Sequence, residues 1–118
     1  MSEIIFSYTR KQAIEDGTLV PVNQSLMYQA GFKYPTVITQ GLHGTMEEAD
    51  KGGWASYQGM LWDVLNGMKF ATILMKNKKT DRVHFTIRIG TRAHALYSVC
   101  HPDDEGKPCL TIMLEGED

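Results

Sequence analysis

The chain has 118 residues, 42% of them hydrophobic, which is enough for one core without stabilisation by disulfides or metal ions. Two cysteines are too few for a disulfide framework, and a formal net charge of −2 gives no overall attraction to nucleic acid or anionic membranes. The N-terminal residues lack the pattern of a signal peptide, and no apolar run is long enough to span a membrane. We therefore expect one soluble, cytoplasmic domain over residues 1–118, of a bacterial type and with no membrane partner.

A short helix is predicted near the N-terminus, over about residues 10–16. Thr9 and Gln12 have the spacing of a capping box, in which each side chain bonds to the backbone amide of the other residue. Gly17 follows at the position where a left-handed residue ends a helix. The next segment, residues 19–22, contains a proline and is expected to be an edge strand or a packed linker.

Two further short helices and a loop are predicted in the next thirty residues or so. Asn23 or Ser25 can cap a helix that ends before Gly31. Pro35 stands where a third helix would begin, because proline is favoured in the first helical turn. The apolar side of that helix would consist of Val37, Ile38 and Leu42. Residues 43–53 are rich in glycine and charge, and this composition predicts a mobile loop.

A long amphipathic helix is predicted over about residues 56–76. Its apolar residues recur at intervals of three and four, which is the period of one helix face. They are Tyr57, Met60, Leu61, Val64, Leu65, Met68, Ala71 and Leu74. Gly59 and Gly67 each cost about 1 kcal/mol relative to alanine within a helix, so tertiary packing must hold this helix together. A break at residues 66–67 is the alternative.

Three strands are predicted after this helix, over about residues 82–89, 94–100 and 109–114. In the first strand apolar residues alternate with polar ones, as they do in a strand with one buried face. Short connections that contain Gly90 and Gly106 favour antiparallel pairing. The predicted fold is therefore α+β, with N-terminal short helices and one long helix packed on a C-terminal three-stranded antiparallel β-meander.

The two faces of this predicted sheet depend on the pairing of Ile87 near Ala95. The buried face would then consist of Val83, Phe85, Ile87, Ala95, Tyr97, Val99, Leu110, Ile112 and Leu114. The outer face would carry Arg82, His84, Thr86, Arg88, Leu96, Ser98, Cys100, Cys109 and Thr111. The expected core comprises Tyr57, Met60, Leu61, Val64, Leu65, Phe85, Ile87, Tyr97 and Ile112. A shift of one residue in the pairing would exchange the two faces of the second strand.

The cysteines and histidines do not form a recognisable catalytic or metal-binding pattern. Cys100, His101 and Cys109 lack the paired, short spacing of zinc ligands. Cys100 and His101 are adjacent in a strand and would point to opposite faces, which argues against a nucleophile paired with a base. We expect reduced cysteines that pack as small apolar side chains, no metal or other cofactor, and no catalytic residue.

The outer face of the predicted sheet is the candidate partner surface. Its polar row consists of Arg82, His84, Thr86 and Arg88, and Lys78 and Lys79 precede this row in the chain. Positive charge concentrated near an aromatic residue is typical of nucleic-acid binding, although an ordinary solvated connector has the same composition. We expect residues 43–53 to contribute to the same surface.

Several segments of the chain also carry a resemblance to a known family. They are Phe6-Ser-Tyr-Thr-Arg10, Gln12-Ala-Ile-Glu-Asp-Gly17, Ala30-Gly-Phe-Lys-Tyr-Pro35, Leu61-Trp-Asp-Val-Leu65, and Asp103-Asp-Glu-Gly-Lys-Pro108 through Leu110-Thr-Ile-Met-Leu114. In this order they resemble a family of small bacterial proteins of unknown function, borne by plasmids, phages and integrated elements. The resemblance implies an accessory role in a mobile genetic element and supplies no catalytic residues.

The expected function is that of a non-catalytic protein that binds a macromolecular partner. A protein partner is favoured, and by analogy with small proteins that act by occlusion it could be a host defence system of the CRISPR or restriction type. A nucleic-acid-binding module that uses the basic outer face is one alternative, and a small enzyme with an unrecognised site is another. A homodimer could use the same face.

Overall fold

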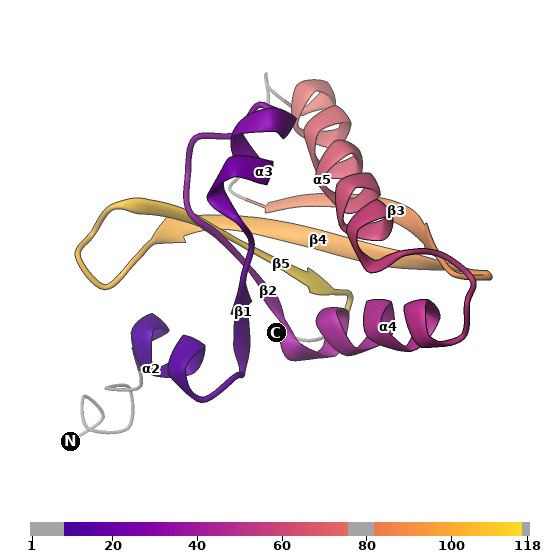
Figure 1. The fold of residues 1–118 in the computed structure, drawn as a ribbon. Helices are drawn as coiled ribbons and strands as arrows, with labels where there is room; N and C mark the ends of the chain where they lie inside the picture. Colours follow the sequence, from indigo (N-terminus) through magenta and orange to yellow (C-terminus); the bar gives the residue numbers. More distant parts are fainter. Residues whose placement is uncertain (1–8, 76–81, 117–118) are drawn as a thin grey trace.

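A five-stranded mixed sheet forms the centre of the fold and carries three helices on one face (Figure 1). The computed structural model describes residues 9–75 and 82–116. In order across the sheet, the strands are β1 (Leu19–Pro21), β2 (Thr36–Thr39), β5 (Pro108–Leu114), β4 (Arg92–Pro102) and β3 (Arg82–Ile89). In these described ranges, no helix has the length and apolar character that a membrane span requires. The α+β class is confirmed, and the sheet has two more strands than the predicted meander.

The capping residues set the boundaries of the helices. The helices are α2 (Arg10–Glu15), α3 (Gln24–Ala30), α4 (Gln40–Lys51) and α5 (Tyr57–Leu74). Thr9 and Gln12 form the predicted capping box at the start of α2. Asn23 accepts hydrogen bonds from two backbone amides at the start of α3, which ends at Gly31 with a φ of 95°. The hydroxyl of Ser56 accepts a hydrogen bond from the amide of Gly59 in the first turn of α5. These three helices agree with the sequence prediction.

The loop predicted over residues 43–53 is wrong, because most of this segment belongs to α4. The hydroxyl of Thr39 caps the helix by accepting a hydrogen bond from the amide of Leu42. Leu42 and Met46, one turn apart, are fully buried against the sheet and α5. Their burial offsets the two glycines of the helix, each of which disfavours helical structure by about 1 kcal/mol.

The third predicted helix is also wrong, because residues 36–39 form strand β2. Val37 and Ile38 are each 1% exposed, so this strand is buried on both of its faces. A strand covered on both faces shows no alternation of apolar and polar residues, and its sequence resembles that of a buried helix segment. β2 pairs in parallel with β5 and antiparallel with β1. The predicted edge strand at residues 19–22 is confirmed as β1.

Helix α5 continues through Gly67 without a break. A Cβ atom at this position would lie 2.5 Å from Cδ1 of Ile87 and 3.1 Å from Cδ2 of Phe85. Both side chains belong to β3, so the missing side chain at position 67 allows α5 to lie close to this strand. The glycine therefore serves the packing of helix on sheet rather than a kink.

The pairing of β3 with β4 differs by one residue from the predicted register. Ile87 lies opposite His94 rather than near Ala95. The shift exchanges the faces of β4: the helix-covered face receives Leu96, Ser98 and Cys100, and the other face receives Ala95, Tyr97 and Val99. The predicted assignment of these six residues is therefore wrong, while the predicted faces of β3 stand.

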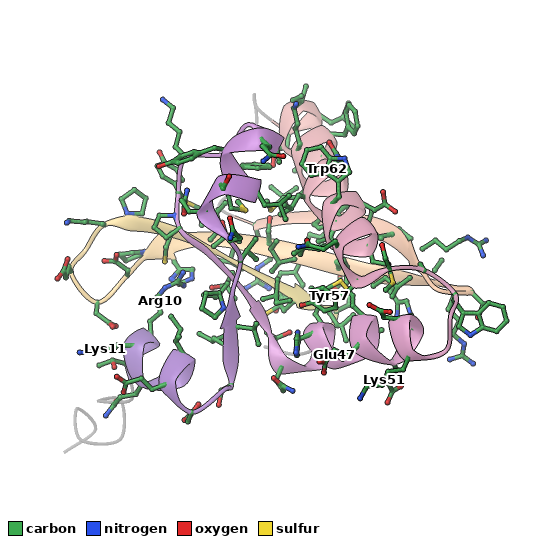
Figure 2. The ribbon with its side chains drawn as sticks, in the orientation of Figure 1. Arg10, Lys11, Glu47, Lys51, Tyr57 and Trp62 are labelled. Atoms are coloured by element: carbon green, nitrogen blue, oxygen red, sulfur yellow. The ribbon has the colours of Figure 1, made fainter. Side chains whose placement is uncertain are left out.

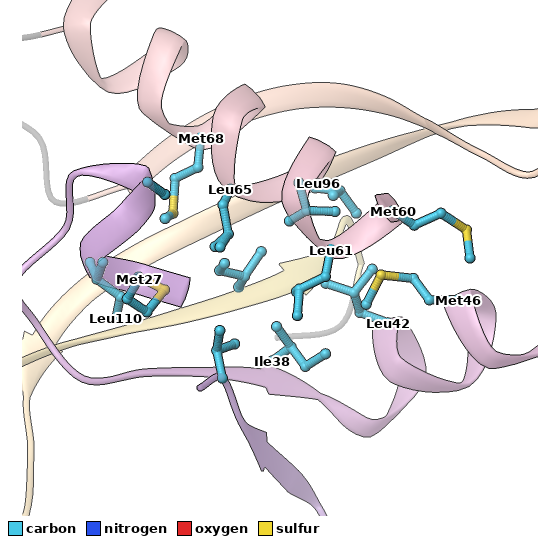
Figure 3. Close-up of a cluster of buried hydrophobic side chains, with 14 of the residues drawn as sticks. Met27, Ile38, Leu42, Met46, Met60, Leu61, Leu65, Met68, Leu96 and Leu110 are labelled. Carbon is cyan, nitrogen blue, oxygen red and sulfur yellow. The ribbon is translucent and has the colours of Figure 1, made fainter. Parts of the chain in front are cut away.

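The core lies between the helices and the covered face of the sheet (Figure 3). Six of the predicted core residues are buried: Met60, Leu61, Val64, Leu65, Tyr97 and Ile112. Tyr57, Phe85 and Ile87 are partly buried and pack against the same cluster. Met27 from α3 and Met46 from α4 fill the ends of this layer, which explains part of the high methionine content.

Candidate functional site

The sheet face that points away from α3, α4 and α5, called the open face below, carries the predicted site. Strict alternation along β3 leaves four side chains exposed on this face: Arg82, His84, Thr86 and Arg88. The structure thus brings together the strand residues of the predicted partner surface. Lys78 and Lys79 lie outside the described residues. Residues 43–53 do not contribute as predicted, because α4 packs on the opposite face.

The buried ring of Tyr97 supports two side chains of the exposed row on the open face. Its side chain is 1% exposed although it points away from the three covering helices. The Cζ atom of Arg82 lies 4.7 Å from the centre of the tyrosine ring, and the His84 ring stacks on it with 5.4 Å between centroids. A guanidinium group over an aromatic face is stabilised by about 0.5–2 kcal/mol. Both side chains are therefore held in defined positions at the surface.

Two hydrogen bonds also hold His84 and Arg88 of this exposed row in place. Nδ1 of His84 lies 2.5 Å from a carboxylate oxygen of Glu115, and Nη1 of Arg88 donates to the carbonyl oxygen of Thr91 at 3.3 Å. Arg88 follows Arg82 by six steps of extended strand, which corresponds to roughly 20 Å. The open face thus presents the two positive groups of Arg82 and Arg88 at a fixed spacing along β3. The carboxylate of Glu115 lies at His84, between these two arginines in the row.

A second group of side chains lies on the open face near α2. Nη1 of Arg10 donates to Oγ1 of Thr111 at 3.4 Å, and Nε2 of His101 lies 2.7 Å from the same oxygen (Figure 2 labels Arg10). Sγ of Cys109 is 3.7 Å from Nδ1 of His101. Burial raises the pKa of the Cys109 thiol, and the charge of Arg10 opposes this effect only in part. A neutral, buried thiol is a poor nucleophile, so this group is better suited to packing than to catalysis.

The sequence did not indicate this pair of cysteine and histidine. His101 is adjacent to Cys100 in the chain, but across the β4–β5 hairpin it lies opposite Cys109. Cys100 lies opposite Leu110 on the helix-covered face, so the sheet separates the two cysteines, which are both free thiols. Among the residues that the structure describes, no three histidine, cysteine or acidic side chains are grouped to hold a metal ion.

A third polar cluster joins α4 to α5 beside a hollow of about 400 Å³. The hydroxyl of Tyr57 lies 2.6 Å from Nδ1 of His43, and Nε2 of this ring lies 3.3 Å from a carboxylate oxygen of Glu47 (Figure 2). Because a carboxylate only accepts, a neutral His43 ring donates from Nε2 to Glu47, and its Nδ1 accepts from the phenol. Burial and the Glu47 charge raise the pKa of Tyr57, which keeps the phenol neutral. The amide of Tyr57 also donates to Asp50, so the cluster fastens the two helices together.

Comparisons with models of protein families, with curated proteins and with solved structures give no match to this chain. The functional interpretation therefore depends on the chemistry of the open face. On that face the pairing of strands positions Arg82 and His84 on one buried ring, while Arg88 and Thr86 extend the row along β3.

Proposed function

We propose that this protein is a non-catalytic binding protein whose open face engages an acidic surface on a protein partner. The packing of Arg82 and His84 on the buried ring of Tyr97 is the observation that carries the proposal. Arginine and tyrosine dominate the energetic centres of protein interfaces, because they combine large contact areas with directed hydrogen bonds. Side chains that are already ordered lose less conformational entropy on binding.

Charge complementarity favours an acidic partner surface. The row on β3 carries Arg82 and Arg88, and positive groups of this kind speed encounter and select against partners of like charge. Thr86, which lies between them on the same face, can donate or accept a hydrogen bond. One face of β3 therefore presents two positive charges, with a hydroxyl group between them.

The sequence resemblance suggests where to look for the partner. Proteins borne by plasmids and phages meet the defence systems of their hosts, so a CRISPR or restriction complex is the first class of partner to test. Small proteins can inhibit such complexes by covering a binding surface, which requires no catalytic residue.

Nucleic acid is a second candidate partner, and the same stack favours it. Arginine beside an aromatic ring is a feature of surfaces that bind single strands. Against this candidate, Glu115 lies within the row at His84 and the chain has a net charge of −2. We therefore rank the protein partner first.

Reversal of charge on the open face tests the proposal. We expect Arg82→Glu combined with Arg88→Glu to lower the affinity for the partner at least about tenfold, because each substitution replaces attraction with repulsion. Affinity capture from a bacterial lysate with mass spectrometry identifies the partner, and calorimetry with the purified partner then gives the dissociation constants.

The matched control carries the same change of charge on the side of the helices. Lys33→Glu with Lys69→Glu alters two exposed lysines near α3 and on α5, and should leave the affinity within about twofold. Equal affinity of the open-face variant and the wild type for the captured protein would exclude this face as its binding surface.

A salt series separates the two candidate partners. If the open face binds single-stranded DNA or RNA, the logarithm of the affinity falls linearly with the logarithm of the salt concentration, and loss of one phosphate contact flattens the slope by about 0.7. Such behaviour, together with the absence of a captured protein, would favour nucleic acid over the proposed protein partner.

A further inference from the structure

An apolar pocket of about 220 Å³ lies under the C-terminal half of α5, on the helix-covered face of the sheet. Met68 and Thr72 line it from α5, and Ser98 and Cys100 line it from β4. The segment between α3 and β2 closes one side with Phe32 and Tyr34. The sheet separates this pocket from the open face, so a ligand here is independent of the proposed partner.

The pocket offers a ligand one hydroxyl group, that of Ser98. Ser98 is 3% exposed, and none of the hydrogen bonds among the described residues involves its hydroxyl group. The hydroxyl of Thr72 donates to the carbonyl of Met68 at 2.7 Å, so this neighbour is already satisfied as a donor. The Ser98 hydroxyl is therefore available to bond to the polar group of a bound molecule in place of water.

The lining that the described residues provide disfavours a charged ligand. The described residues around the pocket are aromatic, aliphatic, sulfur-containing or hydroxyl-bearing, and none carries a charge. An ion would lose its hydration here without gaining a partner of opposite charge. Phe32 and Tyr34 present aromatic rings to the pocket, and Met68 presents a thioether, a group that packs favourably against aromatic rings.

We propose that this pocket binds a small neutral aromatic molecule with one hydrogen-bonding group, of the size of phenol or indole. An apolar cavity of about 150 Å³ accepts benzene in another protein, so 220 Å³ accommodates a ring with one substituent or a fused pair of rings. The aromatic ring lies among the apolar side chains, and its polar group bonds to the hydroxyl of Ser98.

The two cysteines provide a direct assay of occupancy. Cys100 is partly buried and lines the pocket, whereas Cys109 is fully buried on the other face of the sheet. We expect saturating phenol or indole to slow the labelling of Cys100 by N-ethylmaleimide at least about fivefold, because the ligand covers the thiol. Benzoate, which is charged, should have no effect. Mass spectrometry of the two cysteine peptides gives the labelling rate of Cys100, and the buried Cys109 should remain unlabelled as long as the protein is folded.

The Ser98 hydroxyl is tested by substitution. Ser98→Ala should weaken phenol binding about tenfold, as expected for loss of one hydrogen bond, and should change benzene binding by less than about twofold. Saturation-transfer NMR measures both affinities. A phenol affinity unchanged by Ser98→Ala would overturn the proposed binding mode.

A pair of larger substitutions tests the location. Val83→Phe fills the pocket and should abolish protection of Cys100, whereas Val99→Phe adds the same bulk to the open face and should preserve it. Circular dichroism tests whether each variant is folded. If Val83→Phe does not fold, the effect of Ser98→Ala on phenol affinity decides whether the ligand binds in this pocket. The proposal is overturned if no neutral aromatic slows labelling, or if benzoate protects Cys100 as well as phenol does.

Discussion

At the scale of single residues, the two cysteines show how strongly the surroundings determine the chemistry of a side chain. Cys109 is fully buried beside His101, and burial raises the pKa of its thiol. The folded protein therefore retains this proton at pH values where the unfolded chain has lost it. Folding and ionisation of Cys109 are coupled as a result.

This coupling predicts a loss of stability at alkaline pH. The ordinary thiol pKa is 9.0, so the stabilisation is complete below this value and declines as the pH rises toward the higher pKa of the folded state. One proton sets a limit of about 1.4 kcal/mol per pH unit on the slope. Urea unfolding at several pH values under reducing conditions measures it.

Variants assign the effect to one thiol. Cys109→Ala should flatten the decline between about pH 8 and 10, although it also lowers stability at neutral pH by leaving a small cavity. Cys100→Ala, on the other face of the sheet, should retain the slope of the wild type. A decline of the same slope in the Cys109→Ala variant would show that another group is responsible.

At the scale of elements, α4 illustrates a helix that forms against its own composition. Glycines and charged residues over residues 43–53 predicted a loop, yet most of this segment is helical, and Leu42 and Met46 on one face of the helix are completely buried. His43 adds a hydrogen bond to Tyr57 at the start of α5. Tertiary contacts thus outweigh the low helix propensity of the segment.

Replacement of a glycine tests the helical state of α4. No atom lies within 4 Å of the position that a Cβ atom would occupy at Gly44, so Gly44→Ala should raise the free energy of unfolding by about 0.5–1 kcal/mol. Gly31→Ala is the contrasting variant, because a φ of 95° disfavours alanine there by about 1 kcal/mol or more. Chemical denaturation measures both, and destabilisation by Gly44→Ala would contradict the helical assignment.

At the scale of the whole molecule, one core joins α3, α4 and α5 to the covered face of the sheet. Leu65 is fully buried at its centre, whereas Phe70, on the same helix, is 64% exposed. Large side chains of α5 therefore differ in their contribution to stability according to the side of the helix on which they lie.

Truncation of these two side chains measures that difference. We expect Leu65→Ala to cost about 2–5 kcal/mol, through lost burial and the cavity that remains. Phe70→Ala should change the free energy of unfolding by no more than about 0.5 kcal/mol, because the ring is mostly in water. Similar costs for the two variants, measured by denaturant unfolding, would contradict the orientation of α5.

The sequence by itself determined the features that depend on local interactions. Thr9 marked the start of α2, and Asn23, one of two candidate caps, marked the start of α3, because each cap bonds to amides only two or three residues away. The alternation along residues 82–89 identified both a strand and its exposed row, since successive strand side chains point to opposite faces.

Tertiary structure alone decided the features that depend on distant segments. The burial of β2 on both faces removes any alternation from its sequence, so only its pairing with β1 and β5 identifies it as a strand. The register of β3 and β4 placed Tyr97 under Arg82, and the separate register of β4 and β5 brought His101 to Cys109. A shift of one residue in either pairing would have separated the corresponding pair. The exposed row of β3 could therefore be predicted from one strand alone. The aromatic ring that orders this row lies on β4, and contacts between strands are fixed by their pairing rather than by neighbours in the chain.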